Sequence, residues 1–358
     1  MLGRKVKTAL DLFLGKMPEF VLQLFAKIFS YFKNILSQKY AKSRRYKRLL
    51  RLCDFVITRC NGNRFIEYEL SNICNAQCVF CPYPDMLRTE KKFMHMPKDV
   101  MESNLKKLSH FNSAMLSFTP TTGDTLLHPE WDEYIQSALE SKYVHRATMF
   151  TNAIKLDEEN RGKFINLLKT KNGNKLSEIY FSLGGLDAVT YKALYKVDRF
   201  DLVVSNIARF LEQLKEEGLT MGIHIHVKLL KGQKLDADLA SKIFNTTDYP
   251  FVYYSQSNLY FSNEQYTRNS LIDYKPDHWA IKTKACAYLN KTRFAADGAI
   301  WADGCVISEM PGDSSLKLGE NNSSWEAIES KRKLLIGNWE EKQEIPLPCR
   351  ACTMYRPR

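Results

Sequence analysis

The sequence Phe-Ile-Glu-Tyr-Glu-Leu-Ser-Asn-Ile-Cys-Asn-Ala-Gln-Cys-Val-Phe-Cys-Pro at residues 65–82 joins a strand-like run to a cysteine-rich loop. Further strand-like runs follow at residues 114–118, 146–150, 178–183, 221–230 and 251–255. Helical stretches alternate with them near residues 98–108, 130–141, 156–168, 187–194 with 202–216, and 236–245. This alternation predicts an α/β fold with a parallel sheet and helices outside it. Curled up, such a sheet forms a partial (β/α)6 TIM-like barrel, which binds ligands at the C-terminal ends of its strands.

The composition is that of a folded protein with a basic N-terminus. The chain has 358 residues, of which 44% are hydrophobic and 26% charged, and this excludes a wholly disordered chain. Its net charge is +12, but residues 1–51 hold 13 Lys or Arg and two acidic residues, so the remainder is nearly neutral. We expect a basic amphipathic helical segment at 1–62, the barrel at 63–270 and a small cysteine-bearing extension at 271–358.

The N-terminal segment combines many Phe and Leu side chains with a run of basic residues. This combination favours a peripheral contact of residues 1–51 with an anionic membrane surface. A helix packed on the body with a solvated basic flank is the second interpretation, and a nucleic-acid-binding arm is the least favoured. The apolar stretch 8–14 is too short for a secretory signal, and Glu19, Lys27 and Lys33 interrupt the best transmembrane candidate. We expect a cytoplasmic protein; if residues 1–51 contact a membrane, we expect a peripheral position at its inner face.

The cysteines fall into two distant clusters, with two single cysteines outside both. In a cytoplasmic protein, clustered thiols indicate metal binding or catalysis rather than disulfides. Cys74, Cys78 and Cys81 have the spacing C-x3-C-x2-C. They can hold three irons of a [4Fe–4S] cluster and leave the fourth iron without a protein ligand. A structural zinc site would need a fourth ligand, for which His95 is the only nearby histidine.

The loop from Cys74 to Cys81 resembles the signature of the radical S-adenosylmethionine (SAM) enzymes. The resemblance implies that the open iron chelates SAM and that an electron donor such as flavodoxin or ferredoxin reduces the cluster. SAM would then be cleaved to methionine and a 5′-deoxyadenosyl radical, which abstracts a hydrogen atom from the substrate. The same resemblance assigns Phe80, the aromatic residue before the last cysteine, to the cofactor site.

A segment after the second strand also resembles this family. Residues 122–129 occupy the position of the usual Gly-Gly-Glu-Pro motif. The resemblance therefore places Gly123 and Asp124 against the amino group of SAM, with Asp124 in the place of the glutamate. Because aspartate is one methylene shorter, backbone carbonyls are the alternative contact, and a turn at a helix N-terminus is the alternative role of Asp124.

Segments after the third and fourth strands continue the resemblance. Residues 151–153 read Thr-Asn-Ala where the family has Thr-Asn-Gly, so Asn152 is an implied SAM-site residue, with a turn-fixing role as the alternative. Ser182 begins a segment that resembles Ser-x-Asp-Gly, and it is the favoured SAM contact. On the fifth strand His224 and His226 alternate with apolar residues, so they share one face, either toward the substrate or in a polar structural role.

The C-terminal extension has enough cysteines to close a second metal site, with zinc as the rival metal on spacing alone. These residues are Cys286, Cys305, Cys349 and Cys352. The extension resembles the SPASM or twitch domains of radical SAM enzymes, because Asp-Gly precedes Cys305, a Leu-Gly pair is followed by Trp, and a C-x2-C pair comes last. A full SPASM domain has more cysteines and two clusters, so the resemblance implies one auxiliary [4Fe–4S] cluster here.

An auxiliary cluster with four cysteine ligands has no free iron, so its expected role is electron transfer. It would accept an electron from a substrate radical that has lost a proton to a base. Acidic residues of the extension are weak candidates for this base, and a turn position is the alternative for most of them. They are Asp297, Asp303, Glu309 and Asp313.

These features favour a radical SAM oxidoreductase that acts on a small polar, sugar or lipid-linked substrate. A radical SAM/SPASM peptide maturase, which crosslinks or epimerises a ribosomal peptide, is the first alternative. A non-catalytic iron–sulfur or zinc scaffold is the second. Nucleic acid is not an expected partner.

Overall fold

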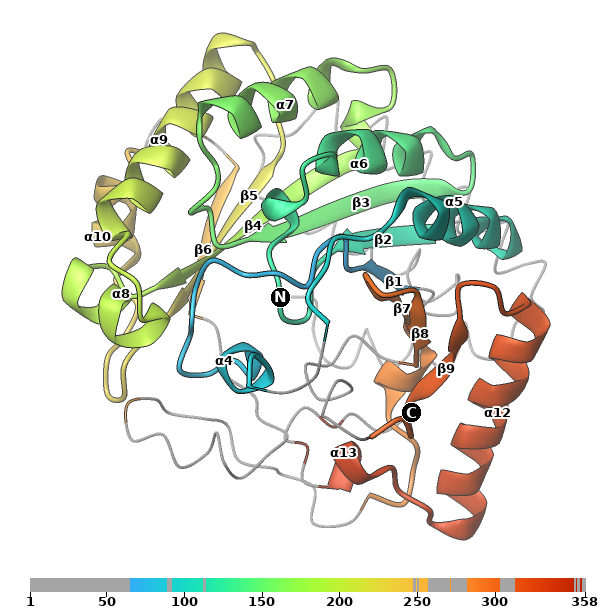
Figure 1. Ribbon diagram of the computed structural model, residues 1–358. Coiled ribbons are helices and arrows are strands. Elements are labelled where there is room, and N and C mark those ends of the chain that lie inside the picture. The colour runs from blue at the N-terminus through green and yellow to red at the C-terminus, as the bar shows by residue number, and fades with distance from the viewer. Residues whose placement is uncertain are drawn as a thin grey trace, which may run out of the picture.

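Figure 1 shows the computed structural model of the protein, which describes residues 65–88, 92–111, 114–246, 249, 251–256, 271, 282–302, 313–350, 352 and 355. The predicted N-terminal segment 1–62, Asp303, Cys305 and Glu309 lie outside the described residues. The membrane contact expected of residues 1–51 therefore stays a prediction. In the part of the chain that is described, no helix combines the length and the apolar character needed to cross a bilayer.

Parallel strands form the main sheet, and they lie in the order in which they occur in the chain. They are β1 (Phe65–Tyr68), β2 (Ala114–Phe118), β3 (Val144–Thr151), β4 (Leu176–Gly184), β5 (Gly222–Lys228) and β6 (Val252–Gln256). The connecting helices cover one side of the sheet (Figure 1): α5 (Lys98–Lys107), α6 (Trp131–Glu140), α7 (Glu158–Lys169), α8 (Ala188–Tyr195), α9 (Phe200–Glu216) and α10 (Ala237–Ile243). The predicted α/β fold with a partial barrel is confirmed, and its sheet is not closed.

Alternation along each strand divides the side chains between two faces of the sheet. On β4, Phe181 and Leu183 are fully buried, and Phe181 packs on Phe210 of α9 with ring centroids 6.1 Å apart. Burial of each such side chain contributes about 1.5–3 kcal/mol to the fold. The intervening residues Tyr180 and Ser182 point to the opposite face, which these helices do not cover.

Aspartates define where several strand-to-helix connections end. Asp157, Asp187 and Asp236 are the N-caps of α7, α8 and α10, and each carboxylate accepts a backbone N–H from the first turn of its helix. Each such cap contributes about 0.5–2 kcal/mol. Each of these loops, at the C-terminal end of a strand, therefore ends at its capping aspartate, where the helix begins.

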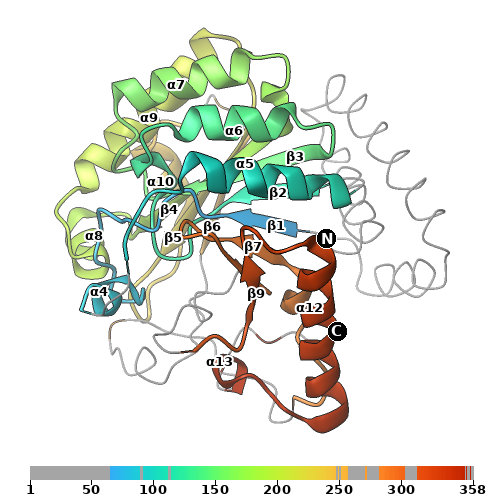
Figure 2. The same ribbon diagram turned by 45° about the vertical axis from the view of Figure 1, so that its right-hand side comes forward.

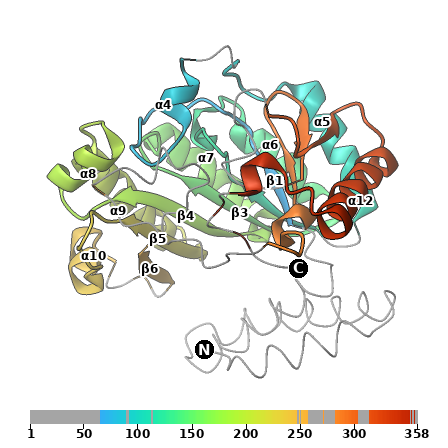
Figure 3. The same ribbon diagram turned by 90° about the horizontal axis from the view of Figure 1, so that it is seen from below.

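The C-terminal extension continues the same sheet beyond β1. β7 (Thr292–Phe294) pairs with β1 in parallel, and β8 (Ala299–Trp301) and β9 (Lys317–Glu320) follow in antiparallel order. α12 (Trp325–Lys342) then runs beside β9, and α13 (Leu347–Arg350) follows it (Figure 2). Viewed from below (Figure 3), α12 lies next to α5, and the ring of Trp325 stacks on that of His110 with centroids 5.8 Å apart.

The sequence pattern does not predict α12, although it is the longest helix among the described residues. Its buried side chains are Ile328, Arg332 and Trp339. The charged one, Arg332, donates to the carbonyl of Lys291 and to the hydroxyl of Thr292. Because this helix is held in part by polar contacts, its hydrophobic periodicity is weak.

A buried ion pair joins the extension to the first strand. Arg293 of β7 lies 3.3 Å from the carboxylate of Glu69, and both side chains are at most 1% exposed. Arg293 also donates to the hydroxyl of Thr121 at 2.7 Å. Glu69 accepts the backbone N–H groups of Thr121 and Ala296. Both charges are therefore paired and hydrogen-bonded, which is the condition under which charge burial is tolerated.

Replacing Arg293 by Met should destabilise the metal-free protein by about 3–5 kcal/mol, because Glu69 would stay buried without its countercharge. The double variant Arg293→Met/Glu69→Gln removes both charges and keeps an acceptor for the backbone, so it should recover much of the loss. Urea unfolding of four proteins, the wild type, Arg293→Met, Glu69→Gln and the double variant, measures both effects. A double variant as unstable as the sum of its single variants would contradict the assigned ion pair.

Candidate functional site

The cysteine loop lies at the C-terminal end of β1 and leads into the short helix α4 (Tyr83–Met86). Its three cysteines are partly buried: Cys74, Cys78 and Cys81. The loop rests on the last turn of α8, because the N–H groups of Gln77 and Val79 donate to the carbonyls of Tyr195 and Leu194 at 3.1 and 2.9 Å. Two elements distant in sequence therefore set its position.

The residues just before the loop are anchored on the segment that follows α4. The side chain of Asn72 accepts the N–H of Met94 at 2.6 Å and donates to the carbonyl of Lys92 at 3.2 Å. His95, which a zinc site would need as its fourth ligand, instead shares a hydrogen bond of 3.0 Å with the hydroxyl of Ser71 through Nδ1. Burial lowers the pKa of His95. These contacts give His95 a structural role.

The thiols of the loop influence one another's ionisation. Burial raises the pKa of Cys74 to about 12, and the negative charges of Asp124 and Cys81 add to this effect. Burial, followed by the charges of Cys81 and Cys74, raises the pKa of Cys78 well above its usual range, while Lys228 opposes the rise. Buried thiols with raised pKa values lose their protons when a bound metal ion places its positive charge beside them.

The loop offers three cysteines at the spacing C-x3-C-x2-C. Among the described residues, no three His, Cys, Asp or Glu side chains converge on one point as the ligands of a single ion do. In a [4Fe–4S] cluster each cysteine binds a different iron, so the thiols need only surround the cluster. Cys74, Cys78 and Cys81 are free thiols on one loop, all partly buried, and are compatible with that requirement.

Asp124 is buried between the ends of β2 and β3. Its carboxylate accepts the N–H of Asn152 at 2.7 Å, the hydroxyl of Thr151 at 3.0 Å and the N–H of Leu126 at 3.0 Å. The backbone N–H of Asp124 donates to the carbonyl of Ile73, just before the cysteine loop, at 2.8 Å. The carboxylate that the resemblance assigns to SAM thus joins its own turn to the end of β3, and the backbone N–H of Asp124 adds the cysteine loop. The carboxylate also caps a short 3-10 helix, which is the alternative role given above. A SAM contact by its backbone stays a prediction.

Gly123 allows the second loop to approach the first. A Cβ atom at this position would lie 2.1 Å from the carbonyl oxygen of Ser71 and 2.8 Å from the backbone of Asn72. Backbone cannot yield to such a clash, so a larger residue would push the cysteine loop away. The structure therefore explains Gly123 by close packing, and its predicted SAM contact stays untested.

Asn152 connects the end of β3 to the cysteine loop. Its Nδ2 donates to Oδ1 of Asn75 at 2.7 Å and to Sγ of Cys74 at 3.9 Å. Its Oδ1 accepts the N–H of Ile154 at 2.9 Å, which fixes the turn after the strand. One side chain therefore both shapes a turn and contacts a cysteine sulfur.

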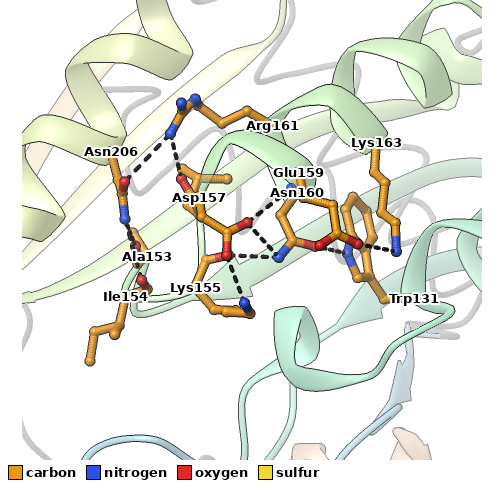
Figure 4. Close-up of polar contacts among 11 residues, drawn as sticks. Trp131, Ala153, Ile154, Lys155, Asp157, Glu159, Asn160, Arg161, Lys163 and Asn206 are labelled. Carbon is orange, nitrogen blue, oxygen red and sulfur yellow. Dashed lines mark hydrogen bonds and ion pairs between the residues drawn. The ribbon is translucent and has the colours of Figure 1, made fainter.

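Ala153 follows in the left-handed region, with φ of 61°. Figure 4 shows how neighbouring side chains hold this turn: Asn206 of α9 donates to the carbonyls of Ala153 and Ile154 at 3.0 and 3.3 Å. Beside it, Asn160 accepts the indole N–H of Trp131 at 2.6 Å. These contacts offset a conformation that costs about 1–2 kcal/mol for a residue with a Cβ atom. They explain why the family's glycine can be alanine here.

Lys228, at the end of β5, is a site residue that the sequence analysis missed. Its side chain is buried, and Nζ donates to the hydroxyl of Ser182 and lies 5.1 Å from the ring centre of Phe80. Burial lowers the pKa of Lys228 to about 8, while the charges of Cys78 and Cys81 oppose this fall. The structure thus brings the predicted residues Phe80 and Ser182 together through a lysine beside the cysteines.

His224 and His226 share one face of β5, as alternation predicts, and Lys228 is the next residue on that face. A polar residue at every second position of this strand was the available signal for Lys228. Burial, followed by the charges of Lys228 and His224, lowers the pKa of His226 to about 4, so its imidazole is neutral at pH 7. Aromatic rings cross the sheet beside it, with successive centroids 4.3, 4.3 and 4.9 Å apart: Phe150, Tyr180, His224 and Tyr253.

His224 has a structural partner in Glu178, whose carboxylate lies 3.7 Å from Nε2. Arg146 pairs with the same carboxylate, and the hydroxyl of Tyr180 donates to it at 2.7 Å. Burial alone would raise the pKa of Glu178, but His224 and Arg146 hold it at about 2. Of the two histidines, His226 therefore remains the candidate for contact with a substrate.

Lys282 organises the cysteine-bearing end of the chain. Its Nζ donates to the carbonyls of Cys349, Arg350 and Cys352 at 3.1, 2.9 and 2.9 Å. The hydroxyl of Tyr355 donates to the carbonyl of Lys284 at 2.7 Å. These bonds hold the segment that contains Cys286 against the C-x2-C pair. The fourth predicted ligand, Cys305, lies outside the described residues.

The described candidates for a catalytic base occupy turns. Oδ1 of Asp297 accepts the N–H of Ala299 at 3.0 Å, and Oδ1 of Asp313 accepts the N–H of Ser315 at 2.7 Å. Both bonds span two residues, as in an Asx turn. The other candidates, Asp303 and Glu309, lie outside the described residues. A role as base stays a prediction for all four.

Stability should depend on pH through Asp124. Burial raises its pKa to about 6, against the opposing hydrogen bonds from Asn152, Leu126 and Thr151. The folded protein therefore holds this proton more tightly than the unfolded chain, and the resulting stability is lost as the pH rises from about 4 through about 6. Two pKa units correspond to about 3 kcal/mol. The free energy of unfolding of the metal-free wild type should fall by about this amount relative to Asp124→Asn, as measured in urea at several pH values. Parallel pH curves for the two proteins would contradict it.

Comparison with known proteins agrees with this geometry. Residues 68–228, from β1 to the end of β5, match the family model described as Radical SAM superfamily, which spans less than half of the chain. No curated protein matches this chain in sequence.

Solved structures share the fold at low identity. The structure of histidine-tagged anSMEcpe with bound AdoMet is 14% identical, covers 81% of this chain and 88% of that chain, and has a TM-score of 0.51. The structure of BtrN in complex with AdoMet and 2-DOIA is 15% identical, covers 80% and 92%, and has a TM-score of 0.44. At such identities the likeness concerns the fold alone. The matched residues 68–228, which include the cysteine loop, therefore resemble a radical SAM domain.

Proposed function

We propose that the protein is a radical SAM enzyme in which Cys74, Cys78 and Cys81 hold a [4Fe–4S] cluster and the fourth iron binds SAM. The observation that carries this proposal is the loop with Cys74, Cys78 and Cys81 at the C-terminal end of β1, inside the residues that match the radical SAM family. When bound, the cluster and SAM supply a hydrogen-abstracting radical, which protein side chains alone do not provide.

The chain's own residues would stabilise the negative charge of the cluster and its cysteine thiolates. Lys228 places a buried positive charge beside Cys78 and Cys81, where it offsets the charge of the thiolates. The hydroxyl of Ser182 accepts a hydrogen bond from the ammonium group and so orients it. Asn152 keeps the end of β3 against the loop through its bonds to Asn75 and Cys74.

We further propose that the substrate is a small polar, sugar or lipid-linked molecule that becomes oxidised. The support is the sheet face that the helices leave uncovered, which presents the phenol of Tyr180, the neutral imidazole of His226 and the ammonium of Lys228. Aromatic surfaces with a few hydrogen-bonding groups are the usual lining of sites for small polar ligands.

The proposed oxidation includes an auxiliary [4Fe–4S] cluster, which would supply an electron acceptor. Its ligands in this proposal are the four cysteines of the extension: Cys286, Cys305, Cys349 and Cys352. The support is the set of bonds from Lys282 that holds the C-x2-C pair against the segment of Cys286. The parallel pairing of β7 with β1 gives this extension a fixed attachment to the radical SAM domain.

Anaerobic reconstitution with iron and sulfide, followed by dithionite and SAM, tests the main proposal. The wild type should produce 5′-deoxyadenosine, whereas Cys81→Ala should lose at least about two orders of magnitude of this activity, because the cluster lacks one of its three protein ligands. Cys60→Ala, which changes a cysteine outside both clusters, is the matched control and should keep wild-type activity. A wild type that binds iron but never cleaves SAM would replace this proposal with the scaffold alternative.

Iron content tests the auxiliary cluster. The reconstituted wild type should hold about eight irons per chain, and Cys352→Ala about four, because each cubane contributes four. Lys282→Met should also lower the iron content toward four, since three carbonyls that position the C-x2-C pair would lose their donor. Lys284→Met changes an exposed lysine of the same segment and should leave the iron content unchanged. Four irons in the wild type would contradict the auxiliary cluster.

A further inference from the structure

α8 presents a tyrosine to the cysteine loop that none of the contacts above uses. The last turn of α8 carries the loop through the carbonyls of Leu194 and Tyr195. Tyr191 lies one turn earlier on the same helix, and its ring stacks on that of Tyr195 with centroids 4.9 Å apart and planes 24° apart. Tyr195 in turn meets Phe80 of the loop edge-on at 5.7 Å. Tyr191 therefore belongs to the helix face against which the loop packs.

The backbone of β4 brings α8 unusually close to the sheet. A Cβ atom on Gly184 would lie 2.5 Å from the ring of Tyr195, and one on Gly185 would lie 2.4 Å from the side chain of Thr190. Gly185 also has φ of 78°, which favours glycine. The two glycines thus allow α8, and with it Tyr191, to pack closely at the end of β4 where the cysteine loop rests on the helix.

The hydroxyl of Tyr191 is fully buried and has no hydrogen-bond partner in the described part of the chain. Burial raises the pKa of this phenol, and the charges of Cys78, Cys74 and Asp124 raise it further. Two of these three groups are proposed cluster ligands. A buried hydroxyl without a partner is costly, and the charges that act most strongly on this one are those of Cys78 and Cys74, whose sulfurs become anionic when metal binds.

We infer that the Tyr191 hydroxyl donates a hydrogen bond to a sulfur of the [4Fe–4S] cluster held by Cys74, Cys78 and Cys81. The inference rests on the proposed function. A hydrogen bond to sulfur stabilises the reduced, more negative cluster more than the oxidised one, and so raises the reduction potential. Tyr191 is therefore a tuning residue, which acts from the side of α8 while Asn152 donates to Cys74 from the side of β3.

Tyr191→Phe removes only the hydroxyl and is the variant that tests this role. In a redox titration followed by electron paramagnetic resonance, the signal that changes on addition of SAM identifies the cluster of this loop. Its one-electron reduction equilibrium should become about tenfold less favourable in the variant, a fall of about 59 mV in potential. Iron content should stay at the wild-type level, because no ligand is lost.

Tyr68→Phe is the matched control. Tyr68 is equally buried and its hydroxyl also lacks a partner among the described residues, but burial alone raises its pKa, with no contribution from the cysteines. This variant should leave the potential of the cluster unchanged. A Tyr191→Phe protein with the potential of the wild type and of Tyr68→Phe would overturn the inference.

The metal-free proteins provide a second readout that does not depend on activity. In the absence of the cluster, both phenylalanine variants should have a melting temperature equal to or above that of the wild type, because each removes a buried hydroxyl without a partner. A lower melting temperature for metal-free Tyr191→Phe alone would mean that its hydroxyl bonds to the protein, and would overturn the inference. If the wild type binds no cluster on reconstitution, it is the proposed function that fails, which separates the two outcomes.

Discussion

The buried carboxylate of Asp124 holds together the loops that form the site. It accepts two backbone N–H groups and one hydroxyl, from its own turn and from the end of β3, while its backbone N–H holds the chain just before Cys74. The backbone hydrogen bonds between parallel strands stop where the strands end, so the loops that follow are held to one another by side chains. A short acidic side chain does this here at the cost of keeping a charge, or a proton with a raised pKa, inside the protein.

Electrostatic balance is the second requirement that the site meets. The thiols of the cysteine loop raise one another's pKa values, and the nearby carboxylate of Asp124 adds to this effect on Cys74. Lys228 is the opposing charge, buried at the end of β5 with Ser182 and Phe80 around its ammonium. The cluster of the proposed function would complete this balance, with the loop, the lysine and Asn152 as one unit beside it.

The extension is part of the same body rather than a separate appendage to the sheet. β7 pairs with the edge of β1, and the buried pair Glu69–Arg293 joins β7 to the residue that follows β1. Thr121 bonds to both members of this pair and lies two residues before Gly123. The same ion pair therefore supports the attachment of the extension and the loop that packs on the cysteines.

Features that depend on local spacing could be predicted from the sequence. Periodicity predicted the βα alternation, and the sequence placed the loop of Cys74, Cys78 and Cys81 at the end of β1, because both signals lie within a few residues of chain; the metal role of this loop stays a prediction. The role of Asp124, the presence of Lys228 beside the cysteines and the pairing of β7 with β1 emerged only from the folded structure. α12 was missed because a buried arginine interrupts its apolar face. The role of Asp124, the place of Lys228 beside the cysteines and the pairing of β7 with β1 depend on contacts between residues far apart in the chain, and a single sequence does not show which distant residues will be partners.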